Sequence, residues 1–192
     1  IALLALSQCR DAETPLPTDP GPGDAAFAMA GAERALRITT GEVSLLNTAI
    51  ERFLANPSEA SRASAQGAWH TAHDAWLTAL APAALVSGNS VQRHAFSIDA
   101  WPVTPGYLDT LPDYPHSGIV ADVTLSLDAA TVRRQHGFSD DSEVALGFHA
   151  IATLLARPLD NFLDDTELVA RRRQLLAPVS YTHLTLPTND QV

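Results

Sequence analysis

Apolar residues recur at spacings of three and four along much of this chain, which is the period of an amphipathic helix. The longest such stretch covers residues 25–56, which we therefore predict to be one long helix. Its apolar positions are Phe27, Leu36, Val43, Leu46, Ile50, Phe53 and Leu54. A second helix is predicted to start at Asn56-Pro57-Ser58-Glu59, with Asn as the cap, Pro at the first helical position and Glu59 completing a capping box. It should end near Ala81, because Pro82 follows.

The pattern changes over residues 86–127. This segment is punctuated by proline and glycine and shows no sustained helical period. Residues 97–107 cannot be helical throughout, since Pro102 and Pro105 interrupt them. Irregular segments of this length in compact domains are usually functional or packed tightly against the rest of the domain.

Helical signals return after this segment. Asp128 is placed to cap a short helix through Gln135, with Gly137 as its terminator. Asp140 and Glu143 are predicted to cap the next helix, which would end near residues 157–158. A last helix should begin around Asp165. Since no convincing strand alternation is present, the expected class is all-α: a helical bundle with a long irregular Pro/Gly-rich segment.

The composition fits one soluble globular domain. The chain has 192 residues, of which 46% are apolar, and a mean hydropathy of +0.01. The formal net charge is −10, and all 12 basic residues are Arg. This acidic balance argues against binding to nucleic acid or to an anionic membrane surface, and it is readily explained by solubility.

The first residues suggest export. Residues 1–9 resemble the end of a bacterial lipoprotein signal, in which Cys9 would be acylated, although Gln8 departs from the small residue expected there. The alternative is an ordinary cleaved signal with an incidental cysteine. The apolar run is too short for a transmembrane helix. Residues 10–24 contain Pro15, Pro17, Pro20 and Pro22 and are expected to form an extended tether.

Residues 25–178 are expected to form the folded domain. Residues 179–192 resemble the translation of a transposase adapter used in preparing sequencing libraries, with a genuine threonine-rich tail as the alternative. His183 is therefore not expected to have a functional role.

The strongest chemical signal is Gly147-Phe148-His149-Ala150-Ile151-Ala152. A carboxylate three residues after His149 would share its helix face and could ligate the same metal ion. That position is Ala152, which cannot ligate. His149 is therefore either packed in a helix–helix contact, bonded to a carbonyl or carboxylate, or a metal ligand whose partners come from other helices.

Other polar residues are weaker candidates. Asp99 either forms a turn by accepting from backbone amides or contacts a ligand in a pocket. His73 lies on an apolar face between two tryptophans, which favours a hydrogen-bonded core histidine. His116 is open to either interpretation. His70 with Asp74 could bind a cation weakly, but such a pair is more typical of a solvated surface contact.

Taken together, several blocks resemble the imelysin-like proteins. They are Ser97-Ile98-Asp99-Ala100-Trp101-Pro102, Pro105-Gly106-Tyr107-Leu108-Asp109, Tyr114-Pro115-His116-Ser117-Gly118-Ile119-Val120, Gln135-His136-Gly137-Phe138 and Gly147-Phe148-His149-Ala150-Ile151. The resemblance covers residues 25–177.

This resemblance implies an exported, often lipid-anchored, all-helical protein of bacterial cell envelopes, built from two similar bundles of which this chain would hold the first. It also implies iron or other metal uptake, with His149 and Asp99 at a site for a divalent metal or iron. The family motif G-x-H-x-x-E lacks its Glu at Ala152, and an acidic position expected on the second helix is Leu80. We therefore expect a binding protein rather than an enzyme, with a metal ion or an envelope protein as partner. The alternatives are a metallopeptidase and a non-catalytic envelope module that binds a protein.

Overall fold

The computed structural model describes residues 21–87 and 89–181. This part of the chain contains helices and no β-strand, apart from one isolated bridge between Leu111 and Tyr114, so the all-α prediction is confirmed. The helices are α1 (Pro22–Ala55), α2 (Glu59–Ser87), α3 (Asn89–Asp99), α4 (Ala129–Gln135), α5 (Gly147–Leu155), the 3₁₀ helix η1 (Leu159–Phe162) and α6 (Glu167–Tyr181). The predicted lipidation site Cys9 and residues 182–192 lie outside the described residues.

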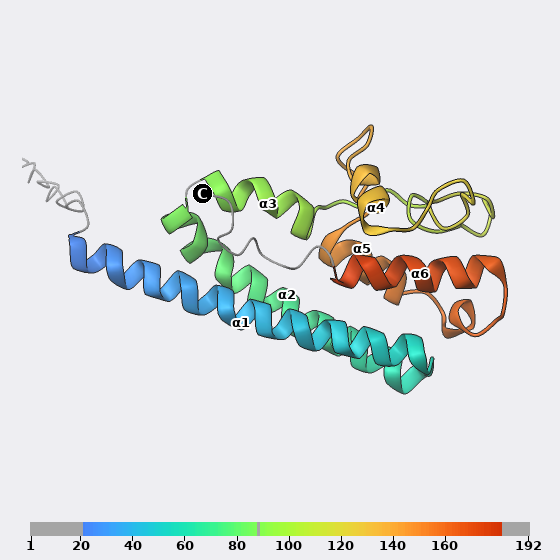
Figure 1. The fold of residues 1–192 in the computed structure, drawn as a ribbon, viewed down its shortest axis with the longest axis horizontal. Helices are drawn as coiled ribbons and strands as arrows, with labels where there is room; N and C mark the ends of the chain where they lie inside the picture. Colours follow the sequence, from blue (N-terminus) through green and yellow to red (C-terminus); the bar gives the residue numbers. More distant parts are fainter. Residues whose placement is uncertain (1–20, 88, 182–192) are drawn as a thin grey trace, which may run out of the picture.

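Helices α1 and α2 form a long antiparallel hairpin, which lies along one side of the molecule (Figure 1). On α1 the buried positions follow a three-to-four spacing: Ala32, Thr39, Val43, Leu46, Ile50 and Phe53. On α2 most of the buried positions are alanines, which lets the two helices approach closely. The Thr39 hydroxyl donates across the contact to the Ala75 carbonyl at 3.1 Å.

Both ends of this hairpin differ in detail from prediction. Helix α1 begins at Pro22, inside the predicted tether, because proline suits the first helical turn and the Asp24 carboxylate accepts from the Gly21 amide at 3.1 Å. The cap of α2 is Ser58 rather than Asn56, since the Ser58 hydroxyl accepts from the Ser61 amide at 3.1 Å. Helix α2 also continues past Pro82, where only one helical hydrogen bond is lost.

The prediction that residues 86–127 are irregular is wrong for the first part of this segment, which contains the helix α3. Ile98 and the half-buried Ala95 supply an apolar side that packs against the hairpin and α5. The helix ends at Asp99, two residues ahead of the Trp101-Pro102 pair, as the prolines require.

The shorter helices are built around turns. The cap of α4 is confirmed, because the Asp128 carboxylate accepts from the Thr131 amide at 2.9 Å. The predicted cap of the next helix is wrong: Asp140 accepts from the Ser142 amide in a turn, and α5 begins only at Gly147. Helix α5 is almost entirely buried and contacts α2, α3 and α6.

A buried ionic cluster fastens the loop after α3 to α6. The Asp109 carboxylate is fully buried and receives Arg172 Nε at 2.5 Å and Nη2 at 2.9 Å, while Arg157 Nε lies 3.1 Å away. Arg171 donates to the carbonyls of Ile119, Val120, Asp122 and Leu125. These contacts keep the loop folded against α6 without regular secondary structure.

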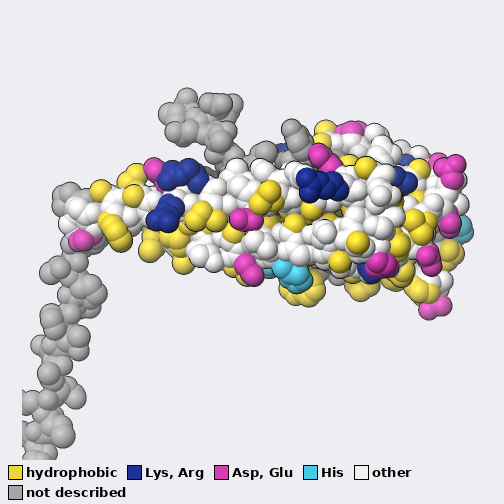
Figure 2. All heavy atoms as spheres, turned by 90° about the horizontal axis from the view of Figure 1, so that it is seen from below, with side chains coloured by type: hydrophobic (Ala, Val, Ile, Leu, Met, Phe, Trp, Pro, Cys, Tyr) yellow, Lys and Arg dark blue, Asp and Glu magenta, His cyan; other side chains and the backbone are white. Residues whose placement is uncertain are grey.

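The hairpin side of the surface mixes apolar and charged side chains (Figure 2). On α1, the large apolar side chains of Phe27, Ile38 and Leu45 are exposed. Within the described residues, none of the helices combines the length and the apolar character needed to span a bilayer.

Candidate metal centre

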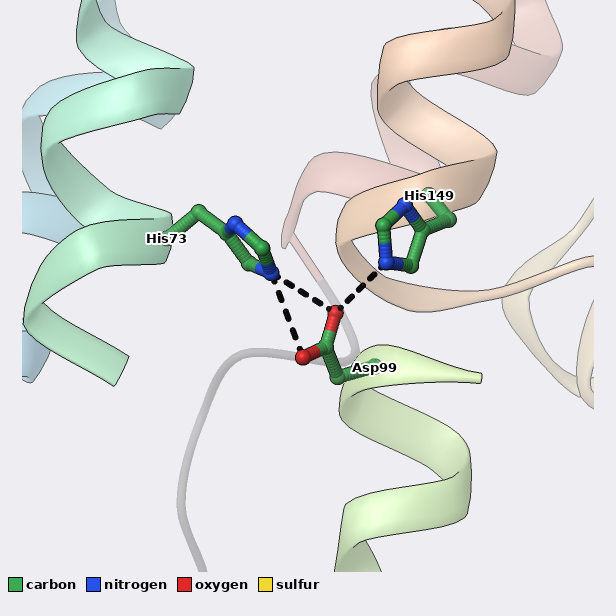
Figure 3. Close-up of side chains that lie close together, drawn as sticks. All are labelled: His73, Asp99 and His149. Carbon is green, nitrogen blue, oxygen red and sulfur yellow. Dashed lines mark hydrogen bonds and ion pairs between the residues drawn. The ribbon is translucent and has the colours of Figure 1, made fainter. Parts of the chain in front are cut away.

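Three side chains from three helices point toward one another on the side of the hairpin that α3 and α5 cover (Figure 3). His73 comes from the middle of α2, Asp99 from the last position of α3 and His149 from the first turn of α5. His73 Nε2 lies 3.0 Å from Asp99 Oδ1 and 3.2 Å from Oδ2, and His149 Nε2 lies 3.2 Å from Oδ1. The ligand atoms of all three residues lie within 4.8 Å of one another. We call these residues the His–Asp–His cluster.

Gly147 makes this convergence possible. Its φ is +79°, and a Cβ built on it would lie 2.2 Å from the carbonyl oxygen of Ile98. The start of α5 and the end of α3 therefore touch through their backbones, which only glycine permits. This contact sets the spacing between Asp99 and His149, so the glycine of the Gly147-x-His149 motif has a geometric role.

Aromatic rings surround the cluster. Trp69 stacks on His73 with ring centroids 4.8 Å apart, and its Nε1–H donates to the Phe148 carbonyl at 2.7 Å. That bond joins α2 directly to the first turn of α5. On the other side, Trp101 lies 4.9 Å from the His149 ring. Each imidazole therefore packs against an indole ring.

His136 joins the segment before α5 to α3 through two hydrogen bonds. Its Nδ1 accepts from the Ala145 amide at 3.2 Å, so its Nε2–H donates to the Phe96 carbonyl at 3.1 Å. Burial lowers the pKa of His136, while the Phe96 carbonyl and Asp141 oppose that effect. The neutral ring is the form that both hydrogen bonds need, because the Ala145 amide requires an unprotonated acceptor.

The electrostatics of the cluster favour neutral imidazole at His149. Burial lowers its pKa below the ordinary value of 6.5; the Asp99 carboxylate acts in the opposite direction, and His73 adds to the lowering. A neutral imidazole has the lone pair that a metal ion requires. The side chains of His73, Asp99 and His149 are only 15%, 14% and 22% exposed.

The donor set fits a transition-metal ion. Each imidazole nitrogen that faces Asp99 must carry a proton if it bonds to the ionised carboxylate, which can only accept. A single cation bound by all three residues would replace those protons and satisfy the same three atoms. Two imidazoles and one carboxylate are ligands for Zn²⁺ and for non-haem Fe²⁺, with further coordination positions left open.

The other predicted residues are not part of the cluster. Ala152 lines a cavity of about 320 Å³ between α2 and α5, next to Trp69 and the exposed His70. His116 is exposed on the loop after α3, and Leu80 packs half-buried against the core. His70 and Asp74 are both exposed on α2.

His73 was predicted to be a hydrogen-bonded core histidine, and its hydrogen-bonding partner is Asp99, which makes it part of the cluster. A histidine on an apolar helix face needs a polar partner when it is buried. Asp99, flanked by the buried Ile98 and Ala100, has the same need. The sequence therefore contained one indication of the pair: His73 and Asp99 each needed a buried polar partner.

A model of the imelysin family matches residues 34–182, which is more than half of the chain. Among curated proteins, none matches this chain.

Proposed function

Since the chain belongs to the imelysin family, we propose that it binds a transition-metal ion through His73, Asp99 and His149. The observation that carries this proposal is the convergence of two imidazole nitrogens and one carboxylate within 4.8 Å. Three helices are needed to bring these atoms together, and a glycine with positive φ keeps two of those helices in contact.

The proposed ion is Fe²⁺ or Zn²⁺. Oxygen-preferring ions such as Ca²⁺ and Mg²⁺ are usually bound by several carboxylates and carbonyls, whereas here two of the three ligands are imidazoles. Iron agrees with a role in metal acquisition at the bacterial cell envelope. In that role the protein would be exported and held by a lipid on Cys9, and would present its metal to an envelope partner.

Binding is better supported than hydrolysis. A metallopeptidase needs a general base beside its metal ligands to activate water. The single carboxylate of the cluster, Asp99, already lies between the two imidazoles, and the position three residues after His149 is Ala152. A bound metal would supply Lewis-acid chemistry, but these residues supply no second acid–base group.

Titration of the purified chain with Fe²⁺ under anaerobic conditions, and separately with Zn²⁺ and Co²⁺, tests the proposal. We expect one ion per chain, with a Co²⁺ absorption spectrum typical of mixed nitrogen and oxygen ligands. His73→Ala and His149→Ala should each weaken binding by at least about tenfold. His116→Ala removes an exposed histidine away from the cluster and serves as the matched control.

Absence of binding, or equal binding by the His149→Ala and His116→Ala variants, would overturn the proposal. Peptide hydrolysis that depends on added metal and is lost in His149→Ala would instead establish the peptidase alternative. Circular dichroism of each variant shows whether the fold is retained.

A further inference from the structure

A second cavity lies beside the metal centre. It has a volume of about 470 Å³ and is formed by the loop after α3 together with the end of α5. Its lining includes Trp101, Leu108, Asp109, Leu111, Thr153 and Arg157. Trp101 also contacts the His149 ring, with centroids 4.9 Å apart, and Thr153 lies one helical turn after His149. The cavity and the His–Asp–His cluster therefore share the Trp101 indole as a common wall.

The cavity carries an excess positive charge. Two guanidinium groups, from Arg157 and Arg172, contact the single carboxylate of Asp109. Arg172 is paired with both carboxylate oxygens and is 3% exposed, whereas Arg157 approaches only one of those oxygens, through Nε, and its side chain is 23% exposed. The neighbouring cation Arg62 is already paired with Glu59 at 2.6 Å. The unbalanced charge therefore belongs to Arg157, which lines the cavity.

The rest of the lining is suited to an apolar body. Leu108 and Leu111 face the cavity together with prolines of the loop and of the end of α5. Trp101 is 71% exposed, although tryptophan side chains are highly buried on average. An exposed indole beside a polar anchor is typical of a surface that a ligand covers.

We propose that this cavity binds a small organic carboxylate, with its carboxylate paired to Arg157 and its apolar body against Trp101. A planar guanidinium recognises a carboxylate through charge-assisted hydrogen bonds. Arg157 donates from Nε toward Asp109 and from Nη2 to the Thr110 carbonyl, so its remaining N–H groups are the ones assigned to the ligand. The site goes beyond metal binding, because it holds an organic anion next to the centre without needing the ion.

The test compares phenylacetate with its neutral isostere phenylacetamide on the metal-free, chelator-treated chain, by calorimetry or ligand-observed NMR. The two molecules differ in charge and hardly in shape. Loss of the charge-assisted bonds should weaken the amide by about tenfold or more. Equal binding of the two molecules, or binding of neither, would overturn the proposal.

Variants then locate the site. Arg157→Gln should remove the preference for phenylacetate, while Arg157→Lys should keep most of it because the charge remains. Arg133→Gln makes the same charge change on the exposed face of α4 and should leave binding unaltered. Trp101→Ala should weaken both molecules alike. If Arg157→Gln does not fold, the isostere pair and the Arg157→Lys variant still decide; an unchanged preference in a folded Arg157→Gln variant would refute the assignment.

Discussion

Replacing Gly147 with alanine should both destabilise the fold and damage the proposed metal centre. The new Cβ would lie 2.2 Å from the Ile98 carbonyl oxygen and 2.6 Å from its carbon. Both of these atoms belong to the backbone of α3, so no side-chain rotation can relieve the clash. The end of α3 must therefore move away from the start of α5.

Two contributions set the size of the effect. Holding alanine at the φ of +79° costs about 1–2 kcal/mol. Displacing the end of α3, where Ile98 is only 5% exposed, adds an overpacking cost of about 1–3 kcal/mol. We expect the free energy of unfolding to fall by about 2–5 kcal/mol, and the melting temperature by roughly 2–4 °C for each kcal/mol.

Chemical denaturation of the metal-free chain measures the loss of stability, and titration with Zn²⁺ measures the damage to the centre. The matched control is Gly67→Ala on α2, where an added Cβ meets nothing within 4 Å; it should stabilise the helix by about 0.5–1 kcal/mol. If the Gly147→Ala chain were within about 0.5 kcal/mol of the unaltered protein, as for a neutral surface change, the role assigned to this backbone contact would be refuted.

Three other predictions follow from the described contacts. Arg172→Met should lower the free energy of unfolding by about 3 kcal/mol in urea denaturation, because the buried Asp109 carboxylate loses its bidentate partner. Stability should fall as the pH drops below about 6.5, because His136 takes up a proton there in the unfolded chain, whereas burial lowers its pKa in the folded protein. The decrease should level off below that lowered pKa. His136→Gln should flatten the profile of stability against pH, measured by denaturation at several pH values. Ala152→Glu should raise Zn²⁺ affinity by about tenfold or more in competition titrations, because it adds a carboxylate on the helix face that carries His149.

Two of these have a control of the same chemical kind. Arg133→Met changes an exposed arginine and should cost little. Ala156→Glu places the same carboxylate just past the end of α5, beside the same cavity, and should not raise the affinity. A pH profile identical in His136→Gln and the unaltered protein would show that other groups, His149 among them, dominate the titration.

The helices could be predicted where local signals agree. The spacing of apolar residues in α1 and the Asp128 cap of α4 both depend on residues that are close together in the sequence, and both elements form as expected. Helix α3 was missed because its apolar side is short, so the helix depends on packing against α5 and the hairpin. Asp140 was misassigned because its carboxylate satisfies a turn amide as readily as a helix terminus.

The site was predictable only in part, because it too depends on contacts between segments that are far apart in the sequence. His149 and Asp99 were both expected as candidates, but their proximity depends on a backbone contact at Gly147 that sequence spacing does not reveal. His73 looked like a core residue because its neighbours on the helix are aromatic, and its partner lies 26 residues away. The cluster was not predicted as a whole because its residues are far apart in the sequence, although their types suit a metal site.

The three proposed ligands are spread over residues 73 to 149 and over three helices that meet in the core. A bound ion would therefore act as a removable cross-link, joining segments in a chain whose single cysteine cannot form an internal disulfide. At free metal about a thousandfold above the dissociation constant, such an ion would add about 4 kcal/mol to the folded state. Resistance to proteolysis would then follow the metal supply, so that the loaded protein persists where the depleted one is degraded.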